Sequence, residues 1–259
     1  MKVYQVEATI LENTHIYSYY YLLKIFTEKI PQDIIPGQFI NLGITETCDP
    51  LLKRPFSPYL LHRDKSIIEI FYKVVGKGTK LLSSMKAGDK LKITGPHGNG
   101  FTIPENAEKV AIVGRGVGIA PLVFLSQELF TRNIDLLSFL SIGEGDFIIG
   151  KKEFEKFNAK IYYSTSNNEL VTDKLWAYLE KGEKIDAIYT CGSRRLRREV
   201  AKMSSKYGIW SQVSLEAVMA CGVGVCMGCT VKIGKPDNWT YKRVCVEGPI
   251  FDTREVIDE

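Results

Sequence analysis

Four cysteines near the C-terminal end of this 259-residue chain have a spacing that could hold a metal cluster. Cys221, Cys226 and Cys229 form a C-x4-C-x2-C loop, and Cys245 follows sixteen positions later. This is the plant-type spacing of [2Fe-2S] ligands. Two irons bridged by sulfides need four thiolates that converge from one side, so three come from a tight loop and the fourth from a separate strand. The sequence therefore predicts a [2Fe-2S] site on these four cysteines.

The residues between the ligands suit the same site. Gly222, Gly224 and Gly228 alternate with the cysteines, and glycine lets a backbone turn through positive φ and pass close to inorganic sulfur. Such a turn directs N–H groups toward the cluster, where hydrogen bonds to sulfur help to set the reduction potential.

Two other uses of the cysteines fit less well. Structural zinc sites more often present two C-x2-C pairs, and only one such pair occurs here, which leaves zinc as the second interpretation. A disulfide framework fits less still, because Cys48 and Cys191 have no near partner in sequence. The opening residues, MKVYQVEATIL, are typical of a strand rather than of a secretory leader. We therefore expect a cytoplasmic protein.

Length and composition indicate a soluble protein of two domains with an appendage. The apolar content of 45% and the charged content of 25% are ordinary for a globular chain. No apolar run approaches the roughly twenty residues that span a bilayer. The net charge of +4 gives no general nucleic-acid footprint. We expect neither a membrane nor a nucleic acid as a partner.

The hydrophobic pattern changes near residue 104. Before it, short β-branched and aromatic runs separated by turn residues predict an antiparallel β-barrel. The predicted strands are Lys2 to Leu11, His15 to Phe26, Gly37 to Gly43, Ser66 to Val75 and Asp89 to Thr94. After it, strands alternate with helices, which predicts a doubly wound parallel sheet. The predicted strands are Val110 to Val113, Ile134 to Ile142, Ala159 to Ser164 and Ile185 to Thr190, and the predicted helices are Ile119 to Thr131, Thr172 to Lys181 and Arg194 to Tyr207.

Two motifs of the first domain could bind a flavin. RPFS at 54–57 offers an arginine for phosphate oxygens, an aromatic for a planar ring and a hydroxyl for a ring nitrogen. VGKGT at 75–79 precedes a helical pattern from Lys80 to Met85, and glycines that open a helix free N–H groups for a pyrophosphate. The alternative is that Gly76 and Gly78 only make a turn, and these residues alone do not decide between the two.

Two motifs of the second domain could bind a dinucleotide. VGRGVGIAP at 113–121 lies between a strand and a helix, where a glycine-rich turn can receive a ligand. Cys191 and Gly192 end a predicted strand, and strand ends in open parallel sheets border the ligand crevice. A lone cysteine at such a position is more often packing.

The order of these motifs resembles that of the ferredoxin-reductase-like flavoproteins. PGQF at 36–39, RPFS, VGKGT and GPHGNGF at 95–101 follow in that order, and the cysteine loop with EGPIFD at 247–252 most resembles the electron-transfer subunits of dihydroorotate dehydrogenase B. The resemblance implies an FAD domain at 1–103, an NAD(P) domain at 104–212 and a [2Fe-2S] domain at 213–259. It implies FAD contacts at Arg54, Pro55, Phe56, Ser57, Gly76, Gly78 and Thr79, with Arg54, Gly78 and Thr79 near the pyrophosphate and Ser57 near the reactive edge of the ring. It implies nicotinamide nucleotide contacts at Gly114, Gly116, Gly118, Cys191 and Gly192.

The second domain departs from the family pattern. Arg115 stands where the turn usually has glycine, Ser193 replaces the usual proline, and the loop at 165–173 is short. Arginines follow at positions 194, 195, 197 and 198, which on their own fit a solvated helix face. Two further interpretations are that they favour NADP together with Ser166, or that they bind an acidic partner.

The sequence predicts cofactor chemistry rather than acid–base catalysis by side chains. His15, His62 and His97 are scattered and fit surface or packing positions. A flavin can exchange single electrons with a cluster and a hydride with a nicotinamide. The resemblance implies an FMN-containing dihydroorotate dehydrogenase subunit as the partner, in pyrimidine biosynthesis. The alternatives are a diaphorase-like subunit of a hydrogenase, a ferredoxin:NADP oxidoreductase, or a zinc-stabilised interaction module without enzymatic activity.

Overall fold

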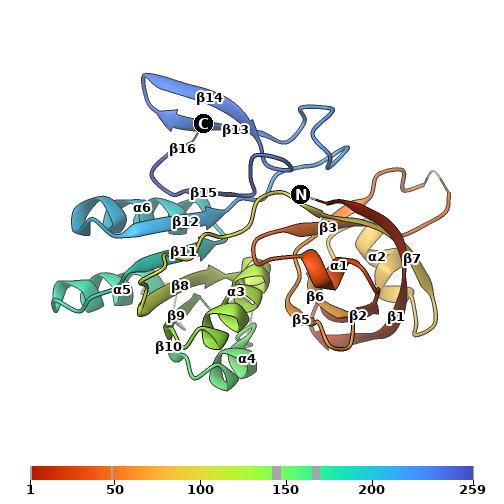
Figure 1. The fold of residues 1–259 in the computed structure, drawn as a ribbon, viewed down its shortest axis with the longest axis horizontal. Helices are drawn as coiled ribbons and strands as arrows, with labels where there is room; N and C mark the ends of the chain where they lie inside the picture. The colour runs from red at the N-terminus through yellow and green to blue at the C-terminus, as the bar shows by residue number, and fades with distance from the viewer. Residues whose placement is uncertain (1, 48, 142–146, 165–169, 259) are drawn as a thin grey trace. The chain divides into compact units, whose positions relative to one another are not determined.

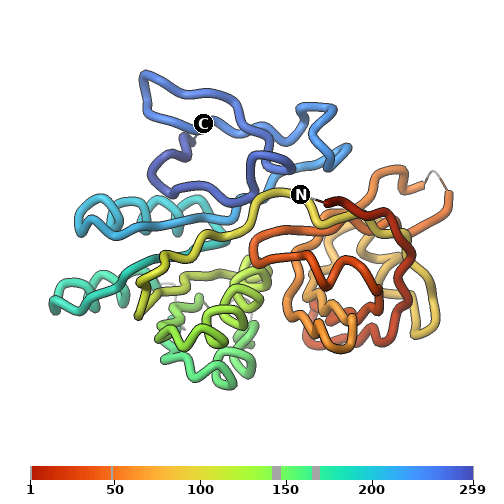
Figure 2. Tube along the Cα trace, in the orientation of Figure 1, coloured from red at the N-terminus to blue at the C-terminus, as the bar shows by residue number. Residues whose placement is uncertain are grey.

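The computed structural model describes residues 2–47, 49–141, 147–164 and 170–258 (Figure 1). Contacts group the chain into two compact units. The barrel unit comprises Met1–Gly100, Glu216–Thr230 and Arg243–Pro249, and the α/β unit comprises Phe101–Leu215, Val231–Lys242 and Ile250–Glu259. The blue end of the trace in Figure 2 contributes to both units. Parts of the expected third segment, 213–259, are grouped with each of these two units.

The barrel unit is built on an antiparallel sheet of seven strands, ordered β4-β3-β7-β1-β2-β6-β5. Its centre is lined by fully buried aliphatic side chains such as Leu23, Ile40, Ile68 and Ile93, which alternate along the strands as one buried face requires. The elements are β1 (Tyr4–Tyr17), β2 (Tyr20–Phe26), α1 (Ile30–Asp33), β3 (Phe39–Gly43), β4 (Arg54–Phe56), β5 (Leu60–His62), β6 (Ile67–Lys73), α2 (Lys77–Ser84) and β7 (Lys90–His97).

The first hairpin differs from the prediction of strands at 2–11 and 15–26. Strand β1 continues through the polar residues 12–14, and the turn lies at Ser18, which has a left-handed φ of 50°. Glu12 pairs with Lys24 across the hairpin, so its side chain is satisfied on the strand by a salt bridge of 3.0 Å. Pairing with β2 therefore outweighs the turn preference of these polar side chains.

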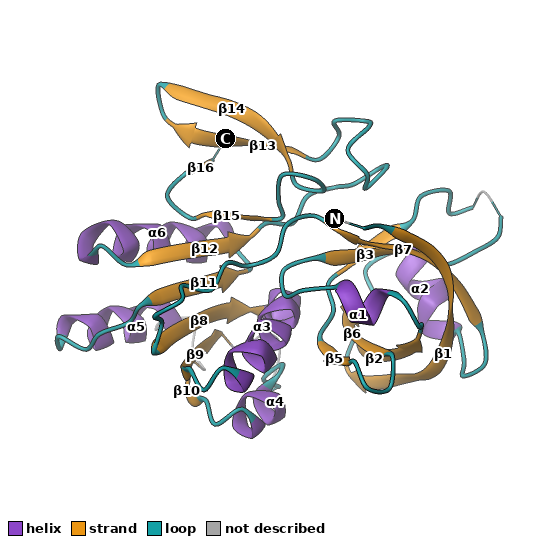
Figure 3. Ribbon diagram, viewed as in Figure 1, coloured by secondary structure: helices purple, strands orange, loops and turns teal. Residues whose placement is uncertain are grey.

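The α/β unit has a parallel sheet that confirms the predicted doubly wound class (Figure 3). Its order is β10-β9-β8-β11-β12-β15, and only β15 is antiparallel. After β8 the chain adds β9 and β10 on one side, then returns to add β11 and β12 on the other. The switch point lies between β8 and β11. The strands are β8 (Lys109–Arg115), β9 (Asp135–Ser141), β10 (Lys160–Ser164), β11 (Ala187–Cys191), β12 (Trp210–Ser214) and β15 (Ile250–Asp252).

Helices cover both faces of this sheet. Leu175 of α5 and Val200 of α6 belong to one buried cluster with Val113 and Phe139 of the sheet. Alternate residues of β8 point to the opposite face, where α3 packs. The remaining elements are η1 (Gly116–Gly118), α3 (Ile119–Thr131), α4 (Lys151–Lys156), α5 (Val171–Glu180) and α6 (Arg194–Tyr207), with a small sheet of β13 (Thr230–Lys235), β14 (Asn238–Arg243) and β16 (Val256–Ile257). In the described ranges, no helix is long and apolar enough to cross a membrane.

Candidate cofactor sites

The four predicted cluster ligands all belong to the barrel unit and form two pairs. The thiol of Cys226 lies within hydrogen-bonding reach of Cys221, and the thiol of Cys229 within reach of Cys245. Cys229 and Cys245 are buried, and Cys226 is exposed. Among the described residues, no three His, Cys, Asp or Glu side chains surround one point for a single ion. Two thiols for each of two irons fit the donor set of a [2Fe-2S] cluster.

Backbone N–H groups of the loop point at the sulfurs. Val223 and Cys226 each direct an N–H to the sulfur of Cys221, at 3.5 and 3.4 Å, and Gly228 directs one to Cys226 at 3.5 Å. These donors lower the pKa of the Cys221 thiol, whereas burial raises the pKa of Cys245. Donors of this kind stabilise a negatively charged cluster, as the glycine pattern predicted.

The cluster loop packs directly on the barrel sheet. Gly222 has a φ of +65°, and a methyl group on it would lie 2.5 Å from the amide nitrogen of Asn41. Asn41 is a buried residue of β3, and it pairs with Pro55 of β4. One buried asparagine therefore joins the cluster loop to the strand that carries the RPFS motif.

The two predicted flavin motifs meet in the structure. A methyl group on Gly78 would lie 2.5 Å from Nε of Arg54, so the guanidinium of β4 lies across the first turn of α2. Arg54 also donates to the carbonyl of Leu52. Both motifs can thus face one phosphate group, because N–H groups in a first helical turn have no partner within the helix.

The other predicted flavin residues flank this contact. The hydroxyl of Thr79 accepts from the N–H groups of Val75 and Gly76, at 2.9 and 3.1 Å, so it fixes the turn that begins α2. Phe56 is half-buried and meets the ring of Tyr72 edge-on, with 5.9 Å between centroids. Ser57, directly after β4, is also half-buried.

The predicted dinucleotide residues meet at the switch point of the parallel sheet, where ligands bind in open α/β folds. Cys191 of β11 lies opposite Gly114 of β8. A methyl group on Gly118 would lie 3.0 Å from the backbone of Cys191 and Gly192, so glycine lets helix α3 begin against the end of β11. Gly116 has a left-handed φ of 57°.

The sequence left open the roles of several residues in this site, and the structure gives three of them different surroundings. The Cys191 side chain is buried, as packing requires, and the Arg115 side chain is exposed at the end of β8. Ser193 caps α6, because its hydroxyl accepts from the Leu196 N–H at 3.4 Å. Ser166 and the rest of 165–169 lie outside the described residues, so the NADP interpretation of that loop stays a prediction.

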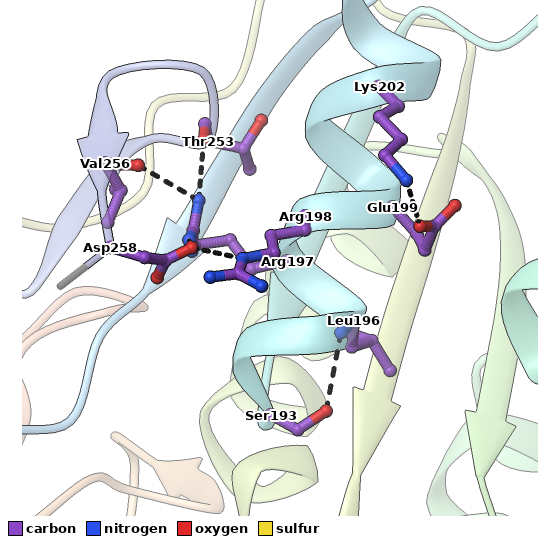
Figure 4. Close-up of polar contacts among 9 residues, drawn as sticks. All are labelled: Ser193, Leu196, Arg197, Arg198, Glu199, Lys202, Thr253, Val256 and Asp258. Carbon is purple, nitrogen blue, oxygen red and sulfur yellow. Dashed lines mark hydrogen bonds and ion pairs between the residues drawn. The ribbon is translucent and has the colours of Figure 1, made fainter. Parts of the chain in front are cut away.

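The arginines of α6 serve two different purposes (Figure 4). Arg197 is only 5% exposed and donates to the carbonyls of Thr253 and Val256, at 3.3 and 3.2 Å. Arg197 and Arg198 both donate to Asp258. A solvated helix face is therefore wrong for Arg197, which ties α6 to the end of the chain. Arg194 and Arg195 are exposed.

Replacing Asp258 by asparagine is expected to lower the free energy of unfolding by about 1–3 kcal/mol at pH 7, because the buried guanidinium of Arg197 loses its charged acceptor. Burial would raise the pKa of Asp258, but hydrogen bonds from Arg198 and Arg197 outweigh it and leave that pKa below its ordinary value. The stabilisation is thus present above the unfolded value of about 4 and is lost as the pH falls through the folded value.

Urea unfolding of wild type and D258N at pH 7 and near pH 3 measures this difference. Lys202→Gln is the control, because Lys202 pairs with Glu199 on the exposed side of the same helix (Figure 4) and such pairs contribute about 1 kcal/mol or less. A difference between D258N and wild type that stays constant with pH would contradict the assignment.

Three polar residues to which the sequence motifs assigned no role hold the cluster region together. The Asn99 N–H donates to Gly248 O at 2.6 Å, and its side chain donates to Glu247 O at 2.9 Å. Arg243 forms an ion pair with Glu247 and holds the pKa of that carboxylate at about 2. The only sequence signal for Asn99 was its place within the GPHGNGF motif. Its role depends on its contact with Glu247, which lies 148 residues later.

The histidines occupy packing or surface positions. His97 is buried against Phe39, and burial lowers its pKa. Nε2 of His62 forms a hydrogen bond with the carboxylate of Glu69 at 3.0 Å, and Nε2 of His15 forms one with the carbonyl oxygen of Ser18 at 2.6 Å. None of the three adjoins the cysteines in the described contacts.

Two family models match the chain. One describes an oxidoreductase FAD-binding domain and matches residues 6–101. The other describes the iron-sulfur cluster binding domain of dihydroorotate dehydrogenase B and matches residues 216–257. These matches confirm an FAD domain and an iron-sulfur domain, and they replace the zinc interpretation.

Relatives match almost the whole chain. The electron transfer subunit of dihydroorotate dehydrogenase B (NAD(+)) from Caldanaerobacter subterraneus subsp. tengcongensis is 38% identical, with 98% of this chain and 99% of the relative covered. The corresponding subunit from Desulforamulus reducens is 35% identical, with 92% and 93% covered. A solved structure of an NADH-dependent reduced ferredoxin-NADP oxidoreductase is 26% identical, covers 96% of this chain and 89% of its own, and has a TM-score of 0.84. The paired cysteines, the flavin motifs and these matches agree: the chain belongs to the family of electron-transfer subunits of dihydroorotate dehydrogenase B.

Proposed function

We propose that this chain passes electrons between a nicotinamide nucleotide and the catalytic subunit of a dihydroorotate dehydrogenase, through FAD and a [2Fe-2S] cluster. The observation that carries the proposal is the contact between Asn41 and Gly222, which joins the RPFS strand pair to the cluster loop within one compact unit. A flavin exchanges a hydride with a nicotinamide and single electrons with a cluster. The chain would therefore convert two-electron transfer into one-electron transfer, or the reverse.

The proposed partner is an FMN-containing subunit that oxidises dihydroorotate to orotate, in the cytoplasm. Exposed apolar side chains lie next to the cluster ligands in the sequence and support a protein partner at this surface. Val218 is 90% exposed and Val225 80%, and Val223 and Met227 are each about half exposed. Apolar groups this exposed on a compact unit are typical of a surface that another protein covers.

The proposed nucleotide is NAD. The relatives are named for NAD(+), and the structure commits Arg197 and Arg198 to Asp258. Arg115 and Arg195 are exposed and could meet a phosphate group of the nucleotide.

The test is an anaerobic visible spectrum of the purified subunit before and after addition of NADH and, separately, NADPH. Flavin and iron-sulfur bands should bleach at least tenfold faster with NADH than with NADPH. In the presence of the catalytic subunit, dihydroorotate should bleach the same bands. Bands that respond to neither nucleotide, even in the complex, would overturn the proposed electron path.

The similarity to the NADH-dependent reduced ferredoxin-NADP oxidoreductase favours a second function, electron exchange with ferredoxin. Reduced ferredoxin would then bleach the flavin bands without a catalytic subunit, and dihydroorotate would have no effect with one. The same anaerobic cuvette separates the two functions.

A further inference from the structure

Arg243 connects the cluster loop to the turn that carries the fourth cysteine. Its Nη1 donates to the carbonyl of Gly224 at 2.7 Å. Its Nε donates to both carboxylate oxygens of Glu247, at 3.0 and 3.2 Å, and Nη2 makes a further hydrogen bond to the same carboxylate. The Arg243 N–H donates to Glu247 as well, at 2.7 Å. The guanidinium is thus held at a fixed place by its partner and has one donor directed at the loop.

The hydrogen bond from Nη1 of Arg243 fixes the orientation of the Gly224–Val225 peptide group in the loop. In a planar trans peptide the C=O and the following N–H point in opposite directions. The carbonyl of Gly224 points at Arg243, and the N–H groups of Val223 and Cys226, on either side of this peptide, donate to the sulfur of Cys221 at 3.5 and 3.4 Å. Gly224 has a φ of +86°, a left-handed conformation that glycine adopts without a steric cost.

We propose that Arg243 is a positioning residue that raises the reduction potential of the cluster by fixing the Gly224–Val225 peptide, and with it the flanking N–H groups of Val223 and Cys226 that donate to the Cys221 sulfur. One-electron reduction adds a negative charge to the cluster, and N–H donors to sulfur stabilise that charge. Glu247 neutralises the guanidinium, so the effect comes from the oriented peptide more than from the charge of Arg243. The inference requires the cluster but neither the partner nor the nucleotide proposed above.

The test is a one-electron dithionite titration, with mediator dyes, of the full chain and of the double variant Arg243→Met/Glu247→Gln. The double variant removes the donor without changing the net charge. Iron and sulfide per chain should equal wild type, and the equilibrium constant for reduction should fall about tenfold, which is about 59 mV for one electron. Proton–deuterium exchange of the reduced cluster, followed by electron–nuclear double resonance, should show one strong exchangeable coupling lost.

Two further variants distinguish the effect of the oriented Gly224–Val225 peptide from the effect of a lost positive charge and from a general disturbance of the cluster loop. Arg243→Lys keeps one donor for the Gly224 carbonyl and should recover most of the wild-type potential. Lys242→Met removes one positive charge from the preceding residue and should change the equilibrium constant less than twofold. An unchanged potential in a fully loaded double variant would overturn the proposal, as would an equal shift in Lys242→Met. If the double variant does not load, Arg243→Met alone is titrated, and an unchanged potential and proton coupling there would overturn it.

Discussion

Replacing Gly98 by alanine is expected to remove most of the [2Fe-2S] cluster while leaving FAD bound. Gly98 has a φ of +73°, and a methyl group on it would lie 2.6 Å from both the carbonyl oxygen of Gly248 and Cδ of Pro249. Both belong to the backbone segment that follows Cys245, and Asn99 holds that segment by two hydrogen bonds. The segment must therefore move, and Cys245 moves with it.

The expected cost has two parts. A left-handed φ costs a residue with a Cβ about 1–3 kcal/mol, and forcing a methyl group into packed backbone adds about 1–3 kcal/mol. Iron and sulfide analysis of G98A, purified anaerobically, should give less than half of the wild-type content per chain. Flavin content should stay near one per chain.

Gly88 provides the matched control. Its φ is +94°, so alanine there has comparable backbone strain, but nothing lies within 4 Å of the added methyl group. G88A should lose about 1–3 kcal/mol of stability and keep a full cluster. A G98A protein with a full cluster, or a G88A protein that loses as much, would show that contact with the 248–249 backbone does not hold the fourth ligand.

The sequence pattern predicted best those features that depend on neighbouring residues. Helices α3 and α6 begin and end at the predicted residues. For α6 both ends have local signals, because Ser193 caps its start and Gly208 ends it with a left-handed φ of 68°. The ligand spacing of the cysteines is local in the same sense, since three of them share one short loop. Such signals do not depend on which distant segment packs nearby.

Features that depend on distant partners were not predictable from the pattern. Strand β1 continues through Glu12 because Lys24 on the next strand forms a salt bridge with its carboxylate. Helix α4 has a single buried side chain, Phe154, and so shows no periodic pattern. The run of arginines predicted a solvated helix face for Arg197, because Asp258, which pairs with it, lies 61 residues later in the sequence.

The same distinction between local and distant signals applies to the residues of the candidate sites. The residues predicted to touch a cofactor belong to fixed motifs of cysteine and glycine spacing, which the sequence shows directly. Residues that hold those motifs in place, such as Asn41, Asn99 and Arg243, are ordinary polar residues in sequence. Their contacts with the cluster loop and the 247–248 segment appear only once the chain is folded.

A Gly78→Ala variant is expected to weaken FAD binding by about ten- to a hundredfold. The added methyl group would lie 2.5 Å from Nε of Arg54 and 3.0 Å from its Cζ, so the guanidinium has to leave its place over α2. A hydrogen bond between a charged donor and a phosphate is worth about 1.5–3 kcal/mol, and each 1.4 kcal/mol is a factor of ten in affinity. Fluorescence titration of the flavin-free protein with FAD measures the change.

The helix itself should gain from this substitution, which makes the test specific. Alanine is about 1 kcal/mol better than glycine within a helix, so α2 is expected to be no less stable in G78A. Gly88 is the control, because it lies outside the predicted flavin motifs and has open space around an added methyl group. G88A should bind FAD within about threefold of wild type. Equal affinities for G78A and wild type would mean that Arg54 does not bind the flavin phosphate from its place beside Gly78.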